Sequence, residues 1–277
     1  MTGMSLAIAM SMAEALEALG ADLGLRPIAG GVGVMLARAL GGEPGERWLG
    51  VGALPPLRGW STDAGGNTIV GAAVTLEELA AGLDPASGLL EAASRSTANS
   101  GIRVVATLGG NVVAGRAASD PVAALVALGA NVELVSAAGI RRVPVEELVA
   151  TGPQRGELVR SFHVPPATLW GWQRLTVRGA MDSSVASVAV VAGGNARVAV
   201  TFAADTVLRL ASVERLLATS VDSATAGNGL RAAATADLAV MMLRGDDRAS
   251  ESYRRRVIPV LVERASADAL ARATAGE

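Results

Sequence analysis

Two glycine-rich segments, AGGVG at residues 29–33 and TLGGN at residues 107–111, each follow a short apolar run. Such a run is typical of a buried strand, and a glycine pair directly after it predicts a tight turn. Glycine leaves the backbone N–H groups of a turn accessible, so they can bind a diphosphate without a lysine. Together the two segments predict a dinucleotide held between two loops.

Each glycine pair alone is a weak signal, because most such pairs only satisfy the positive φ of a turn. Neither segment has the G-x-G-x-x-G spacing, with an acidic residue about 20 positions further on, that marks a Rossmann domain. A nicotinamide-binding Rossmann domain is therefore disfavoured.

The composition predicts a core of small side chains. Hydrophobic residues make up 51% of the 277 residues, yet aromatic residues make up only 3% and there are 33 glycines. A chain of this length can form two or three lobes. Its net charge is -2 and its charges are scattered. This pattern predicts neither a nucleic-acid partner nor an anionic membrane surface.

The chain has no cysteine and a single histidine, His163. It therefore has no disulfide, no thiolate nucleophile and no cysteine ligands for an iron–sulfur cluster. We interpret His163 as structural and predict no catalytic residue. The first ten residues lack a basic region, and no apolar run reaches the roughly 18 to 20 residues of a membrane helix. We expect a cytoplasmic protein without a membrane span.

The periodicity predicts alternating helices and strands up to Pro165 and Pro166, where the proline pair indicates a boundary. A capping box at residues 75–78 begins one helix. Helices are expected at residues 11–19, 34–40, 75–82, 88–97, 120–128 and 145–149, and strand-like runs at 25–28, 48–51, 67–73, 104–106, 131–135, 139–143 and 158–164.

Beyond the proline pair the pattern changes to strands followed by helices, which is typical of an α+β lobe. Three β-rich runs occupy residues 170–177, 184–191 and 197–203, and helices begin near residues 211, 230 and 249. The arginines at residues 254–256 are interpreted as a solvated or partner-facing stripe. We expect an N-terminal α/β lobe at residues 1–58, a second α/β lobe at 59–166 and a C-terminal α+β domain at 167–277.

Several polar and aromatic residues have two interpretations. Asp120, before Pro121, fits a helix N-cap, which the pattern favours, or an acceptor for the sugar hydroxyls of a nucleotide. Trp170 and Trp172 share one face of a strand and fit the core or an interface, although a tryptophan can also cover a planar ring. Arg174 is by default a surface or lobe-interface charge.

The order of these motifs resembles the FAD-binding medium subunit of the molybdenum hydroxylases, the carbon monoxide dehydrogenase and xanthine dehydrogenase family. AGGVG corresponds to that family's AGG-x-[ST], TLGGN matches its T-[IL]-G-G-N, and Asp120 follows at the family's spacing. Residues 180–190 and 253–262 resemble the family's C-terminal domain. The resemblance covers nearly the whole chain.

The resemblance implies an α+β fold: a two-lobed FAD-binding domain of the PCMH (vanillyl-alcohol-oxidase) type, followed by a small C-terminal α+β domain in which helices pack on a three-stranded sheet. FAD is the implied cofactor. Its diphosphate would contact both glycine segments, Asp120 would hold a sugar hydroxyl, and Val159 and Arg174 would lie near the flavin. The implied cofactor-binding residues are Ala29, Gly30, Gly31, Val32, Gly33, Val34, Thr107, Leu108, Gly109, Gly110, Asn111, Asp120, Val159 and Arg174; no metal ligand is implied.

The chain departs from the family pattern at four positions. Gly33 replaces a hydroxyl residue, Arg116 an acidic residue, Trp172 a tyrosine and Arg174 a lysine. Losing one hydroxyl contact costs on the order of 1 kcal/mol, which is too little by itself to abolish FAD binding. A cation near the pyrimidine edge of a flavin would tune its potential.

The implied function is electron transfer within an oxidoreductase. The flavin would take electrons from a small [2Fe-2S] subunit and pass them to an external acceptor, while a large molybdopterin-binding subunit oxidises the substrate, in a heterotrimer or its dimer. A second hypothesis is a structural or assembly subunit that has lost flavin. A self-contained flavin oxidase is disfavoured, because the chain offers no obvious general base.

Overall fold

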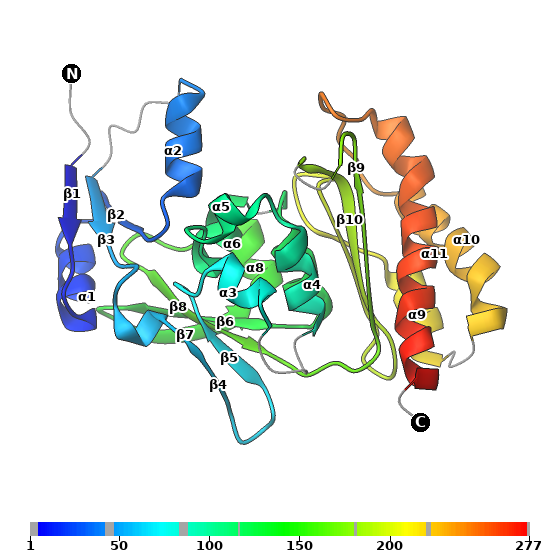
Figure 1. Ribbon diagram of the computed structural model, residues 1–277, viewed down its shortest axis with the longest axis horizontal. Helices are drawn as coiled ribbons and strands as arrows, with labels where there is room; N and C mark the ends of the chain where they lie inside the picture. The colour runs from blue at the N-terminus through cyan, green and yellow to red at the C-terminus, as the bar shows by residue number, and fades with distance from the viewer. Residues whose placement is uncertain are drawn as a thin grey trace.

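The computed structural model describes residues 5–41, 47–82, 88–115, 117–179, 182–219 and 223–275. Three sheets follow one another along the chain, and helices pack against each of them (Figure 1). The described residues contain both helices and strands throughout, which confirms the mixed α and β fold expected from the sequence.

The first sheet is small and parallel. Its strands are β1 (Ser5–Ile8), β3 (Arg47–Gly50) and β2 (Leu25–Ile28), in that spatial order. Helix α1 (Met12–Ala21) begins after the N-cap Ser11 and buries Ala15 and Leu19. Helix α2 (Val32–Ala39) has no buried side chain and stands beside the sheet at the upper left of Figure 1. Strand β1 was not predicted, because its pattern is only four residues long and its pairing with the distant β3 is not visible in local spacing.

The second sheet has five antiparallel strands. Their spatial order is β4 (Trp60–Thr62), β5 (Thr68–Gly71), β8 (Leu158–Val164), β6 (Asn131–Ser136) and β7 (Gly139–Pro144). The short 3-10 helix η1 (Pro55–Leu57) precedes β4. The hairpin predicted from residues 131–143 is confirmed as β6 and β7. The three-residue strand β4 was not predicted, since three residues show no periodicity.

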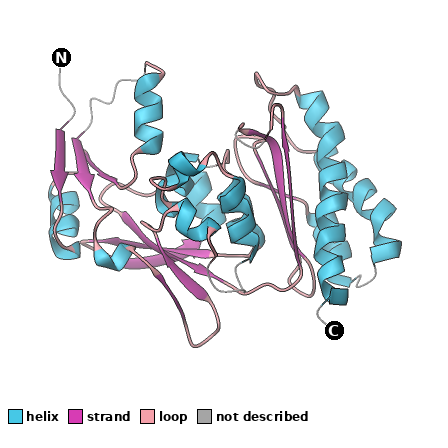
Figure 2. Cartoon of the chain, in the orientation of Figure 1, coloured by secondary structure: helices cyan, strands magenta, loops and turns pink. Residues whose placement is uncertain are grey.

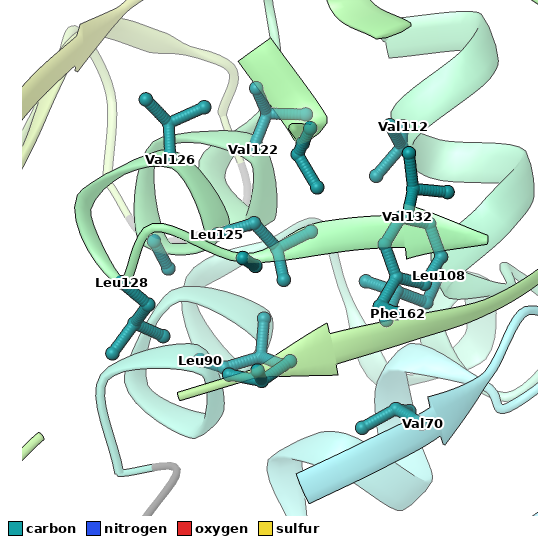
Figure 3. Close-up of a cluster of buried hydrophobic side chains, with 14 of the residues drawn as sticks. Val70, Leu90, Leu108, Val112, Val122, Leu125, Val126, Leu128, Val132 and Phe162 are labelled. Atoms are coloured by element: carbon teal, nitrogen blue, oxygen red, sulfur yellow. The ribbon is translucent and has the colours of Figure 1, made fainter. Parts of the chain in front are cut away.

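Helices gather on one side of this sheet (Figure 2). They are α3 (Leu76–Ala80), α4 (Gly88–Ser96), α5 (Ser100–Arg103), α6 (Leu108–Gly115), α7 (Asp120–Ala127) and α8 (Val145–Thr151). The predicted capping box is present, with Thr75 and Glu78 bonded to each other's backbone. Leu108, Leu125, Val132 and Phe162 belong to the core between helices and sheet (Figure 3). Apolar burial therefore anchors α6 at its first residue.

Three local predictions in this region are wrong. Residues 104–106 do not form a strand but follow α5, and the segment at 107–111 begins α6 instead of forming a loop. Short apolar runs look alike in buried strands and buried helices, so the pattern could not separate them. The N-cap of α7 is Ser119, whose side chain accepts from the Val122 amide, and Asp120 is already in the helix.

The third sheet is antiparallel, with β12 (Leu208–Arg209), β11 (Arg197–Thr201), β10 (Ser184–Val191) and β9 (Trp170–Thr176) in spatial order. The three predicted runs form β9, β10 and β11, and the two-residue β12 extends the sheet. Helices α9 (Ala211–Thr219), α10 (Ser223–Ala239) and α11 (Glu251–Ala275) follow. Helix α11 packs along β9 and β10, whereas α4 and α7 contact this sheet from the second lobe.

Pro165 and Pro166 lie between β8 and β9, at the passage from the second sheet to the third. The packing nevertheless continues across this point, because Ala189 of β10 and Ala199 of β11 belong to the core of the second lobe. The three lobe ranges remain a proposal. Within the described ranges, every helix is too short or too polar to cross a lipid bilayer.

The arginine stripe expected at residues 254–256 is wrong for Arg254. Its side chain is fully buried, with Nε donating to the Val185 carbonyl at 3.0 Å and Nη2 pairing with Asp246 at 2.8 Å. Arg256, two residues later, is exposed. The helical periodicity places these two side chains in different directions, and only the three-dimensional packing selects which is buried.

Candidate functional site

The two glycine segments meet in the fold. A Cβ added at Gly30 would lie 1.7 Å from the carbonyl oxygen of Val105, just before the second segment. A Cβ at Gly33 would lie 3.0 Å from that of Ala114 in α6. Only glycine permits this approach at residue 30, where any side chain would overlap the backbone. Segments far apart in the sequence are thus packed against each other at these two points.

The first segment presents the N-terminus of α2. Gly31 is the N-cap, with a φ of 70°, and no side chain caps the helix. The first turn contains no acidic residue. Helix geometry leaves the leading N–H groups without intrahelical partners, and the helix dipole makes this end favourable for an anion. Gly33 lacks the hydroxyl-bearing side chain of the family pattern. At this residue α2 lies close to α6.

The second segment differs, because its amides are already bonded within the chain. Gly109 lies against Ala72, where an added Cβ would be 2.8 Å from the alanine Cβ, whereas Gly110 is exposed. The expectation of accessible amides is therefore wrong for this segment. The donors and acceptors are Leu108 N to Val74 O (2.9 Å), Gly109 N to Ala72 O (2.8 Å), Gly110 N to Thr107 Oγ1 (3.2 Å) and Asn111 N to Thr107 O (2.8 Å).

Asn111 and Asp120 connect this segment to the C-terminal sheet. Asn111 Oδ1 accepts from the hydroxyl of Ser119, the N-cap of α7. Asp120 is buried, and its Oδ1 accepts from Ser184 Oγ at 3.0 Å and Ser187 Oγ at 2.5 Å. Burial raises the pKa of Asp120 above its ordinary value, while Arg174 and the two serine hydroxyls act in the opposite direction.

A cleft of ≈ 920 Å³ lies between α4, α5 and β9. Its wall on β9 contains Trp170, Trp172 and Arg174, and its opposite wall contains the end of α4 and the start of α5. Arg103 of α5 lines the cleft, and the chain continues from α5 into the second glycine segment. Aromatic and guanidinium groups in one cleft suit a planar ligand with polar edges.

Arg174 and Trp172 are both held at the end of α4. Trp172 Nε1 donates to Ser96 Oγ at 3.0 Å, and Arg174 Nη1 donates to the Ser96 carbonyl. Arg174 also donates through Nε to Ser184 Oγ at 3.1 Å. Ser184 thereby bridges Arg174 to the buried carboxylate of Asp120. The guanidinium is fixed by the second lobe and by the C-terminal sheet together.

Arg103 and Arg272 support the cleft from two sides. Arg103 Nε pairs with Glu77 at 2.7 Å, and its Nη1 donates to the carbonyl of residue 95 in α4 and to those of residues 97 and 98 in the turn before α5. The guanidinium of Arg272 in α11 lies 3.7 Å from the ring centroid of Trp170 and donates to the carbonyl of that residue. These contacts fix both cleft walls.

Val159 and His163 lie away from the cleft wall. Val159 of β8 is buried in the core of the second lobe. His163 Nε2 is 3.6 Å from Glu133 Oε2 and within 3.5 Å of Ser161 Oγ, in the five-stranded sheet. The pKa of His163 is lowered overall, first by burial and then by Arg142, although Glu133 and Asp63 act in the opposite direction. These surroundings support the structural interpretation of His163. Arg116 lies outside the described residues.

The sequence reasoning missed Ser96, Arg103, Ser184 and Ser187 as parts of this arrangement. A serine at a helix end and serines in a strand are common on surfaces, so their residue types give no signal. Arg103 follows a predicted helix and precedes an apolar run, where a charge usually faces solvent. Their partners lie many residues away in sequence, and only the fold reveals the contacts.

Comparison with known proteins decides the family. Residues 2–167 match the family described as the FAD binding domain in molybdopterin dehydrogenase. The chain belongs to this family. The resemblance stated from the sequence is confirmed, and the chain is an FAD-binding subunit of the molybdenum hydroxylase type, a component of an oxidoreductase, with FAD as its cofactor.

Relatives in this family match over almost the entire chain. The putative xanthine dehydrogenase FAD-binding subunit XdhB of Escherichia coli (strain K12) is 27% identical, over 96% of this chain and 95% of the relative. The carbon monoxide dehydrogenase structure from Hydrogenophaga pseudoflava has a TM-score of 0.86 at 26% identity, covering 97% of this chain and 98% of that one. Reconstituted CO dehydrogenase from Oligotropha carboxidovorans gives 0.85 at 26% identity, with 98% of both chains covered.

The local geometry fits a dinucleotide of this kind. The uncapped N-terminus of α2 suits a diphosphate, and the close approach at Gly30 leaves no side chain between the two segments. The cleft has an aromatic and cationic lining that suits a planar ring with polar edges.

Proposed function

We propose that this subunit carries electrons in a molybdenum hydroxylase complex. Its FAD takes electrons from a small [2Fe-2S] subunit and delivers them to an external acceptor, while a large molybdopterin-binding subunit oxidises the substrate. The single observation that supports the proposal is the contact of Gly30 with the backbone of Val105, which brings the two glycine segments close together.

The glycine segments bind the diphosphate in this proposal. The amides of Gly31, Val32 and Gly33 at the start of α2 donate to phosphate oxygens, and the helix dipole adds to the attraction. At the second segment, the exposed Gly110 provides space for the phosphates instead of free amides. Ala29, Val34, Thr107, Leu108, Gly109 and Asn111 shape the two segments around these contacts.

The isoalloxazine ring of FAD binds in the cleft between α4 and β9. Trp172 lines one side of that ring, and Arg174 contributes a positive charge at its edge. When bound, FAD supplies the capacity to accept and release electrons. The fixed guanidinium of Arg174 stabilises negative charge added to a bound ring, and the buried Asp120 carboxylate, linked to it through Ser184, moderates that effect.

Two assigned residues have less direct roles. Asp120 holds a sugar hydroxyl in the sequence-based assignment, but its Oδ1 already accepts two serine hydroxyls. Val159 is buried in the core of the second lobe, away from the cleft wall, so any effect it has on the flavin is indirect. Both assignments remain proposals.

The composition supports the division of labour among subunits. The chain has no cysteine, so it cannot supply thiolate ligands for an iron–sulfur cluster. In this proposal, the iron–sulfur cluster that supplies the electrons lies on another chain. The relatives named above are xanthine dehydrogenase and carbon monoxide dehydrogenase components, which agrees with a complex of several chains. We expect a cytoplasmic heterotrimer or its dimer.

The proposal is tested by purifying the tagged chain from its native cells under gentle conditions. We expect co-purification of a molybdenum-containing large chain and a [2Fe-2S] chain, and reduction of bound FAD when the substrate of the complex is added. A colourless chain that also fails to bind added FAD would contradict the cofactor role. A flavin-containing monomer that turns over a small organic donor alone would contradict the subunit role.

A further inference from the structure

Ser96, the last residue of α4, contacts two side chains on the opposite wall of the cleft. Its hydroxyl accepts from Trp172 Nε1 at 3.0 Å, and its carbonyl accepts from Arg174 Nη1. Trp172 and Arg174 are two residues apart on β9, so both side chains lie on the same face of the strand. One residue of the second lobe therefore holds the aromatic and the cationic group of the wall.

The hydroxyl of Ser96 is oriented for this contact. Ser96 Oγ donates its single proton to the Ala92 carbonyl at 2.8 Å, which leaves its lone pairs to accept from the indole. An indole has only one N–H group, so this bond fixes the direction of the Trp172 ring. The Ser96 carbonyl is among the last four of α4, which have no intrahelical donor, and the guanidinium of Arg174 satisfies it.

The position of Ser96 is itself fixed. Arg103 donates to the carbonyls of residues 95, 97 and 98, on both sides of Ser96, and is paired with Glu77. The turn after α4 is therefore held from α3 through Arg103. Changes at the Ser96 side chain act on β9 without loosening this turn.

We propose that Ser96 is a positioning residue of the flavin site: through its hydroxyl and carbonyl it fixes Trp172 and Arg174 as one wall of the cleft. The proposal rests on the function given above, in which the flavin ring binds in this cleft. Ser96 sets the orientation of the Trp172 indole and thus the contact of that indole with the flavin ring. It acts through Trp172, without touching the reacting atoms.

The test uses the full chain with three substitutions. Ser96→Ala removes the hydroxyl and keeps the carbonyl that binds Arg174, and it improves helix propensity, so the variant should fold. Ser96→Thr keeps a hydroxyl. Thr97→Ala is the matched control, because Thr97 Oγ1 makes the same type of bond, to the Ala93 carbonyl at 3.0 Å, at the neighbouring position.

The first readout needs no cofactor. The chain has four tryptophans, so the emission of Trp172 is obtained by subtracting the emission of the same chain carrying Trp172→Phe. The quenching of this difference signal by acrylamide is then measured for each chain. In the FAD-free chain, Ser96→Ala should increase this quenching, whereas Ser96→Thr and Thr97→Ala should match the wild type. Equal quenching in Ser96→Ala and the wild type would overturn the proposal.

The second readout is the fluorescence of FAD bound to the reconstituted chain, because a nearby indole quenches flavin emission. Ser96→Ala should keep FAD affinity within about fivefold of wild type, since one hydrogen bond is lost. It should also raise emission per bound FAD, and the double variant with Trp172→Phe should emit as Trp172→Phe alone does. An additive effect in that double variant would contradict action through Trp172. A wild-type chain that binds no FAD would contradict the proposed function, while the FAD-free quenching would still judge the role of Ser96.

Discussion

Gly30 of the first lobe faces the carbonyl of Val105 so closely that an added Cβ would lie 1.7 Å from its oxygen. No rotation of a side chain can relieve this overlap, because both groups belong to the backbone. The separation of the N-terminal lobe from α5 and α6 is therefore set by the absence of one methyl group. The proposed diphosphate site lies at this contact.

Replacing Gly30 with Ala should force the two segments apart. We expect a loss of stability of about 1–3 kcal/mol, the usual cost of overpacking, and a much weaker affinity for FAD. Thermal unfolding and FAD titration measure the two effects. Gly194→Ala is the control, because an added Cβ there meets no atom within 4 Å. Wild-type FAD affinity in Gly30→Ala would show that this contact does not shape the site.

Asp120→Asn should change the pH dependence of stability. Burial raises the folded-state pKa of Asp120 above 3.8, so the folded chain holds this proton to a higher pH than the unfolded chain. The wild type therefore loses stability as the pH rises from 3.8 through the raised pKa. The variant lacks this titration, so its stability relative to the wild type should increase as the pH rises over that range. Urea unfolding across the range checks it, and parallel curves would rule out an Asp120 that titrates this way.

His163→Gln should change the dependence of stability on pH at the acidic side of neutrality. Burial lowers the folded-state pKa of His163 below 6.5, so the unfolded chain takes up this proton first on acidification. The wild type should lose stability as the pH falls from 6.5 through the lowered pKa. The variant should lack this loss. The free energy of unfolding, followed from neutral pH downwards in both chains, decides the matter: an identical decline would show that His163 is not the group responsible.

Arg254 and Arg256 offer a matched comparison on one helix. Arg254→Ala should cost about 3–5 kcal/mol, since it removes a buried charge from its partner Asp246 and leaves the Val185 carbonyl without a donor. Arg256→Ala should change stability by less than about 0.5 kcal/mol, because Arg256 is exposed. Urea unfolding of both variants measures the difference. Equal costs would contradict the burial of Arg254.

Sequence patterns predicted the elements that are long or have distinct ends. The capping box at Thr75 and Glu78, the strand β8 and the hairpin of β6 and β7 are predicted from local rules, and the structure has them. The family and its cofactor followed from the glycine motifs and their order. Local propensity and tertiary packing agree in these segments.

What the sequence could not predict depends on contacts between distant residues. Strand β1 exists because it pairs with β3, about forty residues away, and its own pattern is short. Asp120 is joined to Ser184 and Ser187 only after the C-terminal sheet packs on α7. The amides of TLGGN are bonded because residues 72–74 run beside them. None of these partners is visible in local spacing.

The most direct test of the account is FAD binding by Gly110→Val. Gly110 is exposed at the start of α6, and a Cβ there would lie 2.9 Å from Thr107 Oγ1. A valine should therefore project into the proposed diphosphate space at the expense of a local shift of the Thr107 side chain. Val113→Ala, on the same helix, is the control. We predict that the wild type and the control bind FAD and that Gly110→Val, equally well folded, binds it about a hundredfold more weakly, a loss of about 3 kcal/mol. Unchanged FAD affinity in Gly110→Val would contradict the assignment of the two glycine segments as the diphosphate site.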